Sequence, residues 1–130
     1  MASEVNYSRA VRVTPGILNT TLTGAVNNTP FDLNYFKVGE VFVRLQWSTV
    51  IDNAIAASSI VLGDTLPLFV RPSVNIYQPI IVHNNSTEQI GIIEISTDGT
   101  ITIRPDIDFT GTFLFVGNCG ILSGSVVYGV

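Results

Sequence analysis

The segment IEISTDGTITIR, residues 93–104, constrains the fold of this chain more than any other stretch. Apolar and polar residues alternate on both sides of Asp98-Gly99, which is the pattern of two short strands that each bury one face. Asp-Gly between two such runs is a strong signal for a tight turn. The segment therefore predicts an antiparallel hairpin whose isoleucines face a core.

Two turn lengths are compatible with this segment, and they predict different registers. A two-residue turn would place Ile95 opposite Thr102, so that isoleucines would face polar partners. A three-residue turn over 97–99 aligns isoleucine with isoleucine and gives Gly99 the left-handed position at its end. The longer turn is favoured because opposed β-branched side chains stabilise a sheet, and a slip by one residue would expose them. Its predicted pairs are Ser96–Thr100, Ile95–Ile101, Glu94–Thr102 and Ile93–Ile103. The isoleucines then face inward, and the other four side chains form an outward polar face that is a candidate subunit interface.

The alternation with period two continues elsewhere and is clearest in EVFVRLQWS, residues 40–48. Trp47 has the ring to stack on a sugar, but its place on the apolar face of this strand favours a position in the core. The inward side chains are predicted to be Val41, Val43, Leu45 and Trp47, and the outward ones Phe42, Arg44 and Gln46.

Turn residues divide the rest of the chain about every 8–12 residues, as in β-sandwiches and barrels. Pro15-Gly16 predicts a turn after 9–14, Pro79 predicts an interrupted strand over 74–82, and 83–87 predicts an exposed loop. Further predicted elements are strands at 17–25, 31–38, 109–116 and 121–130, a connector at 65–73, a turn at 106–108 and a short helix candidate at 52–59. The pattern predicts one all-β domain over 1–130, an antiparallel β-sandwich or jelly roll of about eight to ten strands.

Charged residues make up 12% of the chain, about half of the usual ~25%, and the formal net charge is −4. No basic run is present, so the composition argues against binding to nucleic acid. The apolar stretches are too short to span a bilayer, which argues against membrane insertion. A surface poor in charge is typical of a chain that buries part of itself in an oligomer. The single cysteine excludes an internal disulfide and fits synthesis in a reducing cytosol.

Residues capable of catalysis or metal binding are few. His83 is the only histidine and Cys119 the only cysteine, so a loop histidine and a small buried thiol are the favoured interpretations. Asp106 and Asp108 have a D-x-D spacing, but nothing nearby completes the six to eight oxygen ligands that calcium needs. We therefore expect no enzyme activity, no metal and no cofactor.

The second half of the chain resembles the C-terminal heads of phage and other viral fibres and receptor-binding proteins. The resemblance rests on the order of VGEVFVRLQWS, GDTLPLFVRPS, an exposed loop, STDGTITIRP and a closing SGSVVYGV, and it covers roughly Lys37 to Val130. Each motif alone is an ordinary β-turn device. The shaft of heptads or G-x-y repeats that usually precedes such a head is absent from these 130 residues.

This resemblance implies a trimeric jelly roll, similar in shape to tumour necrosis factor, that binds a host cell-surface protein or glycan. It further implies contacts with other virion proteins and a place in the virion, assembled in the host cytoplasm. A capsid decoration or minor structural virion protein without receptor binding is the alternative. The family has no motif for its receptor loops, so the candidates here are polar turn residues, namely His83, Asn84, Asn85, Ser86, Asp106 and Asp108.

Overall fold

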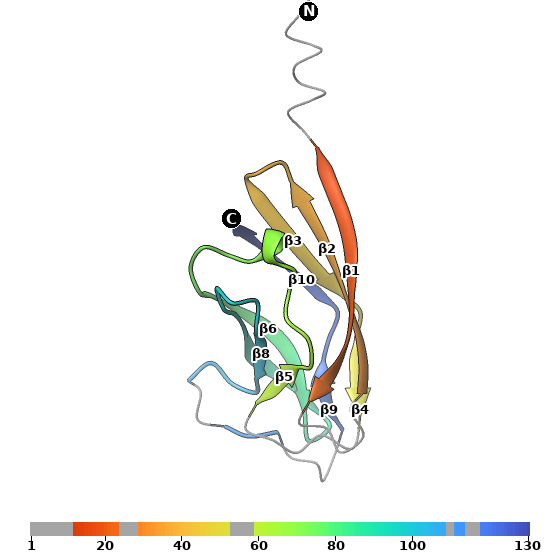
Figure 1. Ribbon diagram of the computed structural model, residues 1–130. Coiled ribbons are helices and arrows are strands. Elements are labelled where there is room, and N and C mark those ends of the chain that lie inside the picture. Colours follow the sequence, from red (N-terminus) through yellow and green to blue (C-terminus); the bar gives the residue numbers. More distant parts are fainter. Residues whose placement is uncertain (1–11, 24–28, 53–58, 109–110, 114–117) are drawn as a thin grey trace, which may run out of the picture.

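The computed structural model describes residues 12–23, 29–52, 59–108, 111–113 and 118–130, which form strands and one 3₁₀ helix, η1 at Leu68–Val70 (Figure 1). Every described strand pairing is antiparallel, so the predicted all-β antiparallel class is confirmed. The strands are β1 Val13–Thr23, β2 Thr29–Val38, β3 Phe42–Trp47, β4 Val50–Asp52, β5 Ile60–Leu62, β6 Ile76–Asn84, β7 Thr87–Ile95, β8 Ile101–Arg104, β9 Cys119–Ile121 and β10 Gly124–Gly129.

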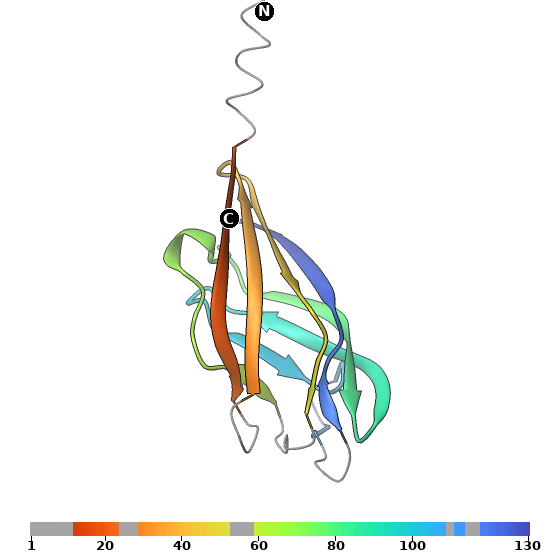
Figure 2. The same cartoon turned by 90° about the vertical axis from the view of Figure 1, so that its right-hand side faces the viewer.

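One curled sheet contains all ten described strands, in the order β10-β3-β2-β1-β5-β8-β7-β6-β9-β4. The sheet folds over where β1 meets β5, because only two residue pairs, at Leu22 and Thr23, join these strands. Strands β1, β2, β3 and β10 thereby form a first layer, and β5 to β8 form a second layer that runs obliquely to it (Figure 2). The inner side chains of both layers share one hydrophobic core.

The β7–β8 hairpin has the register predicted from the three-residue turn. Ile95 pairs with Ile101 and Ile93 with Ile103, and all four side chains are buried. The Ser96 amide donates to the Thr100 carbonyl over 2.9 Å, and Gly99 has a φ of 87°, the left-handed conformation expected at the end of the turn.

Two predicted breaks at proline were wrong. Pro15 lies within β1 opposite Phe36, so 9–14 and 17–25 are not separate strands, and Pro79 lies within an uninterrupted β6 opposite Ile92. Both prolines are exposed on stretches that pair on one side only among the described residues, because β5 and β9 join these strands only near their ends. Proline has no amide hydrogen to donate, and an open strand edge does not require one.

The predicted loop at 83–87 was also wrong. Strand β6 continues through His83 and Asn84, and β7 begins at Thr87, which leaves a two-residue turn of Asn85 and Ser86 with φ values of 52° and 62°. Positive φ at both central residues is the signature of a type I′ hairpin, and asparagine tolerates it well. The turn is therefore tight rather than loop-like.

Two smaller corrections concern the strand ends. Val41 is 69% exposed because it lies in the β2–β3 turn, ahead of β3, so it is not part of the core as predicted. The predicted last strand, 121–130, is split into β9 and β10, which pair with different neighbours. Residues 53–58 of the helix candidate at 52–59 lie outside the described residues, and its first residue, Asp52, is the last residue of β4. Most of the strand predicted at 109–116 also lies outside them, although Phe113 is described and buried.

The connector at 65–73 is confirmed as a non-strand segment, and it ties the two layers together. The Arg71 guanidinium donates to the Leu66 carbonyl over 2.8 Å, and the Leu66 amide donates to the Gly99 carbonyl over 2.9 Å. From the first layer, the buried Tyr128 hydroxyl donates to the Val70 carbonyl over 2.5 Å. Burial raises the pKa of this phenol, so it remains a donor at all physiological pH values.

Candidate binding surfaces

The end of the β6–β7 hairpin contains four of the six residues predicted to bind a ligand, with His83 and Asn84 in β6 and Asn85 and Ser86 in the turn. Many of its hydrogen-bonding groups are already bonded to other groups of the chain. The Asn84 side-chain amide donates to the Thr112 carbonyl over 2.9 Å, and Ser86 exchanges two hydrogen bonds with Asn118, at 2.9 and 3.1 Å. These bonds hold the end of the molecule together and leave few groups to bind a ligand.

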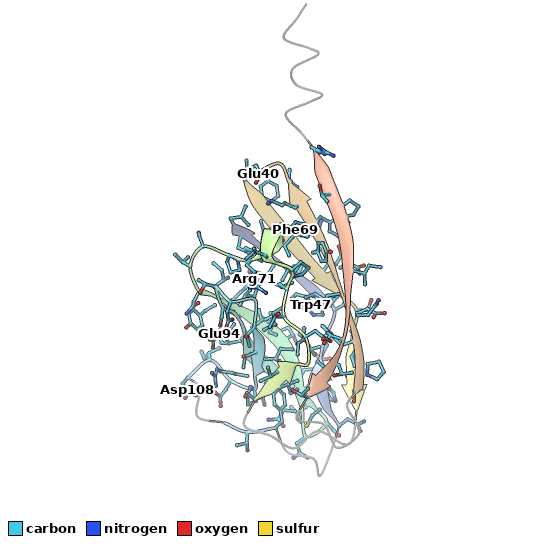
Figure 3. All side chains as sticks on the ribbon, viewed as in Figure 1. Glu40, Trp47, Phe69, Arg71, Glu94 and Asp108 are labelled. Carbon is cyan, nitrogen blue, oxygen red and sulfur yellow. The ribbon has the colours of Figure 1, made fainter. Side chains whose placement is uncertain are left out.

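The remaining predicted residues, Asp106 and Asp108, lie in a separate turn after β8, with Asp108 at the periphery of the molecule (Figure 3). No cluster of three or more His, Cys, Asp or Glu side chains exists within the described part of the chain. Cys119 is free and buried, and its thiol lies 3.6 Å from the Asn84 side-chain oxygen. The structure therefore does not join the two turns into one site.

A polar hollow of about 250 Å3 lies on the first layer, and it was not foreseen from the sequence. Arg44 and Gln46 project from the outer face of β3, and Ser125 pairs with Gln46 from the neighbouring β10. Arg44 lies far from Ser123 and Ser125 along the chain, so only strand pairing brings them together. The sequence did predict that Arg44 and Gln46 face outward from their strand, and this alternation is the signal that could have pointed to the hollow. The hollow is lined by Arg44, Gln46, Trp47, Ser123, Gly124 and Ser125.

Trp47 fixes the floor of this hollow. Its side chain is buried among the core residues, as the sequence predicted, and its indole N–H donates to the Leu122 carbonyl over 2.7 Å. Gly124 lies directly against the ring, and a Cβ at this position would come within 3.1 Å of it. A glycine here allows the start of β10 to lie flat over the indole.

An apolar stripe occupies the outer face of the second layer. We define it as Tyr77, Pro79 and Ile81 on β6 with Ile90 and Ile92 on β7, where Ile81 pairs with Ile90 and Pro79 pairs with the buried Ile92. Tyr77, Ile81 and Ile90 are 53%, 43% and 56% exposed, and a shallow hollow of about 160 Å3 lies beside Ile81 and Ile90. Contiguous exposed apolar side chains of this kind mark surfaces that contact other proteins.

The predicted polar face of the β7–β8 hairpin borders this stripe. Glu94 pairs with Arg104 over 3.4 Å, and Glu94 lies opposite Tyr77 in the register. Ser96, Thr100 and Thr102 complete the polar face as predicted, and all are partly exposed. The outer face of the second layer thus combines an apolar stripe with a polar margin, which is the composition of an interface core and rim.

No protein-family model and no curated protein matches this sequence. Among solved structures, the fold is similar to that of a reovirus attachment protein, sigma1, whose crystal structure was determined in complex with alpha-2,3-sialyllactose. The TM-score is 0.52 at 17% sequence identity, and the match covers 92% of this chain and 66% of that chain. The chain thus spans just under two thirds of the length of this structural neighbour, and the likeness is one of fold. No helix of the described residues is long and apolar enough to cross a membrane.

Proposed function

We propose that this protein is the receptor-binding head of a viral attachment protein, which acts as a homotrimer on the virion and binds a glycan or protein on the host cell surface. Its role is binding rather than catalysis. The head would be assembled in the host cytoplasm together with other virion proteins.

The observation that supports this proposal most directly is the fold likeness to an attachment protein over 92% of the chain. The sequence resemblance to viral fibre heads was drawn from turn motifs alone and points in the same direction. Fold by itself does not specify function, so the proposal depends on surfaces suited to binding. The apolar stripe and the polar hollow around Arg44 are such surfaces, and they lie on different layers.

The apolar stripe is the surface we assign to contact between subunits. It contains no charged side chain, and an exposed apolar surface that stayed uncovered would invite uncontrolled association. A closed ring of three subunits covers such a surface on every copy. Three copies also multiply a weak single-site affinity for a host surface, by about 10²–10⁴ when all sites can engage.

The test combines two measurements on the purified chain, its mass in solution and its binding to host cells and to immobilised glycans. A trimer that binds cells or glycans is the expected result. A monomer that binds neither would overturn the proposal. A chain that binds purified virions but no cell would instead identify a capsid decoration or minor structural protein.

A further inference from the structure

Arg44 differs from most of the described cationic side chains because nothing in the described part of the chain neutralises it. Arg12 also lacks a side-chain partner there, but it lies just ahead of β1 rather than within the sheet. The other three are engaged, through Lys37 Nζ–Glu40 Oε2 at 3.2 Å, Arg104 Nη2–Glu94 Oε1 at 3.4 Å and Arg71 Nε–Leu66 O at 2.8 Å. In a chain with a formal net charge of −4, an exposed arginine in a hollow on the sheet is a local positive centre.

Hydrogen-bonding groups converge on this centre. The side chains of Gln46, Ser123 and Ser125 line the same hollow as Arg44, and none of the four side chains has a hydrogen-bond partner among the described residues. No carboxylate lines the hollow. The hollow therefore offers a guanidinium, an amide and two hydroxyls to a ligand, and nothing in its lining repels an anion.

The backbone that presents the two serines is held in place before any ligand arrives. The Ser123 amide donates to the Thr49 hydroxyl over 2.8 Å, and the Ser125 carbonyl accepts from the Gln78 side chain over 3.0 Å. Between them, Gly124 rests on the buried Trp47 ring. A site on paired strands with a fixed backbone loses little conformational entropy when it binds.

The chemistry of these groups specifies one class of ligand. A guanidinium presents paired N–H donors that match the two oxygens of a carboxylate. The amide and hydroxyls suit the hydroxyl groups of a sugar. Phe36 and Val127, which flank Arg44 across the outer face, offer apolar contact for its C–H groups. The hollow of about 250 Å3 is smaller than the ~300–1,000 Å3 of sites for drug-sized ligands, which favours a single sugar residue over a longer chain.

We propose that the hollow around Arg44 binds one carboxylate-bearing sugar, with the Arg44 guanidinium on the carboxylate and Gln46, Ser123 and Ser125 on the hydroxyls. The proposal rests on the proposed attachment function, since it names the receptor chemistry of that function. A sialic acid and a uronic acid share this chemistry and differ in size and in their side groups.

The test titrates the isotope-labelled chain with the methyl glycosides of sialic acid, glucuronic acid and glucose, and follows backbone amide signals by NMR. We expect the amides of Gln46 and 123–125 to shift with one of the acidic sugars and not with glucose. The acid that produces the shift identifies the source. Equal shifts with glucose, or shifts confined to other residues, would overturn the proposal.

Variants provide the second measurement, on an array of immobilised sialylated, uronic acid-containing and neutral glycans. Arg44→Ala should lower binding to the acidic glycans about tenfold or more, and Arg44→Lys should lower it less, because lysine keeps the charge without the paired donors. Arg12→Ala is the matched control, since it removes another exposed arginine and should leave binding unchanged. Both arginines are exposed, so neither substitution disturbs the core.

The outcomes separate this proposal from the attachment function itself. If the chain binds host cells and Arg44→Ala binds them equally well, the hollow is not the site, and the attachment function stands. If Arg12→Ala and Arg44→Ala weaken binding equally, the attraction is a general effect of charge and the proposed site is wrong. If the chain binds neither cells nor acidic glycans, both proposals fall.

Discussion

The outer faces of the two layers have the same construction but expose different kinds of side chain. Both are outward surfaces of antiparallel strands over one shared core. The first layer carries an unneutralised arginine among small polar side chains, while the second carries the apolar stripe with its polar margin. Polar groups that converge on a hollow suit a small ligand, and a flat apolar surface suits another protein. Under the proposed function, the first face binds the receptor and the second face holds the subunits together.

The largest expected effect tests whether both faces depend on the shared core. Trp47→Ala removes a buried aromatic side chain and its hydrogen bond to the Leu122 carbonyl. We expect a loss of about 3–5 kcal/mol in the free energy of unfolding, measured by urea denaturation. Arg44→Ala, on the outer face of the same strand, should change stability by no more than about 0.5 kcal/mol. Similar losses of stability in both variants would show that the outward polar side chains also stabilise the fold.

The next prediction tests whether the first face binds the ligand and the second face contacts the other subunits. Ile81→Asp places a charge in the apolar stripe, and an unpaired charge is costly to bury in an interface. We expect the mass in solution to fall from trimer to monomer, with association weakened by roughly tenfold or more and the circular dichroism spectrum unchanged. The matched control is Ile17→Asp, which charges an isoleucine on the outer face of the first layer. The roles would be reversed if Ile17→Asp dissociated the trimer and Ile81→Asp did not.

A smaller effect concerns the contact that ties the two layers together. At Gly99, φ is 87°, and a Cβ there would come within 2.9 Å of the Leu66 carbonyl and 2.7 Å of the Arg71 guanidinium. Gly99→Ala should therefore cost about 1–3 kcal/mol in thermal or urea unfolding. Gly129→Ala is the control, because a Cβ there has no neighbour closer than 3.9 Å. A neutral Gly99→Ala would mean that the connector can move away without loss, so that the layers are less rigidly joined.

The hairpin that contains Gly99 was predicted fully because its determinants are local. Isoleucines with period two and an Asp-Gly turn fix the register without knowledge of the rest of the chain. The prolines were misread for the opposite reason. Whether Pro15 or Pro79 interrupts a strand depends on whether a neighbour pairs with that edge, and a single sequence does not reveal its neighbours. The 83–87 segment was misread because its five polar residues resemble a loop, whereas two of them suffice for the turn.

The candidate sites were predicted incompletely for the same reason, since a single sequence does not reveal which strands are neighbours. Sequence reasoning selected exposed polar turns, and it placed Arg44 and Gln46 correctly on an outer face. It did not bring Ser123 and Ser125 beside them, because that contact depends on the pairing of β10 with β3. The predicted last strand ran through residues 121–130 without a break, so the prediction missed that β9 and β10 are separate strands with different neighbours.

The smallest expected effect lies in the β7–β8 turn, at the margin of the second face. The Thr100 amide donates to the Asp98 carboxylate over 3.0 Å, and this hydrogen bond, with a further one from the Thr100 hydroxyl, lowers the pKa of Asp98 below its ordinary 3.8. A depressed folded-state pKa contributes stability that is present above the unfolded value and is lost as the pH falls through the folded value. The stability advantage of the natural chain over Asp98→Asn should therefore hold at neutral pH and shrink below about pH 3.8, in urea titrations at several pH values.

Because Asp98 is fully exposed, this advantage is small. Repeating the titrations at 1 M salt separates its causes, since salt screens the attraction of the nearby Arg71 and largely spares the hydrogen bonds to Thr100. An advantage that vanishes in salt would assign the effect to charge. One that is constant across the pH range would show that the carboxylate has no special role. An advantage that persists in salt and is lost in acid would show that the Thr100 hydrogen bonds organise this turn and that the charge of Arg71 does not.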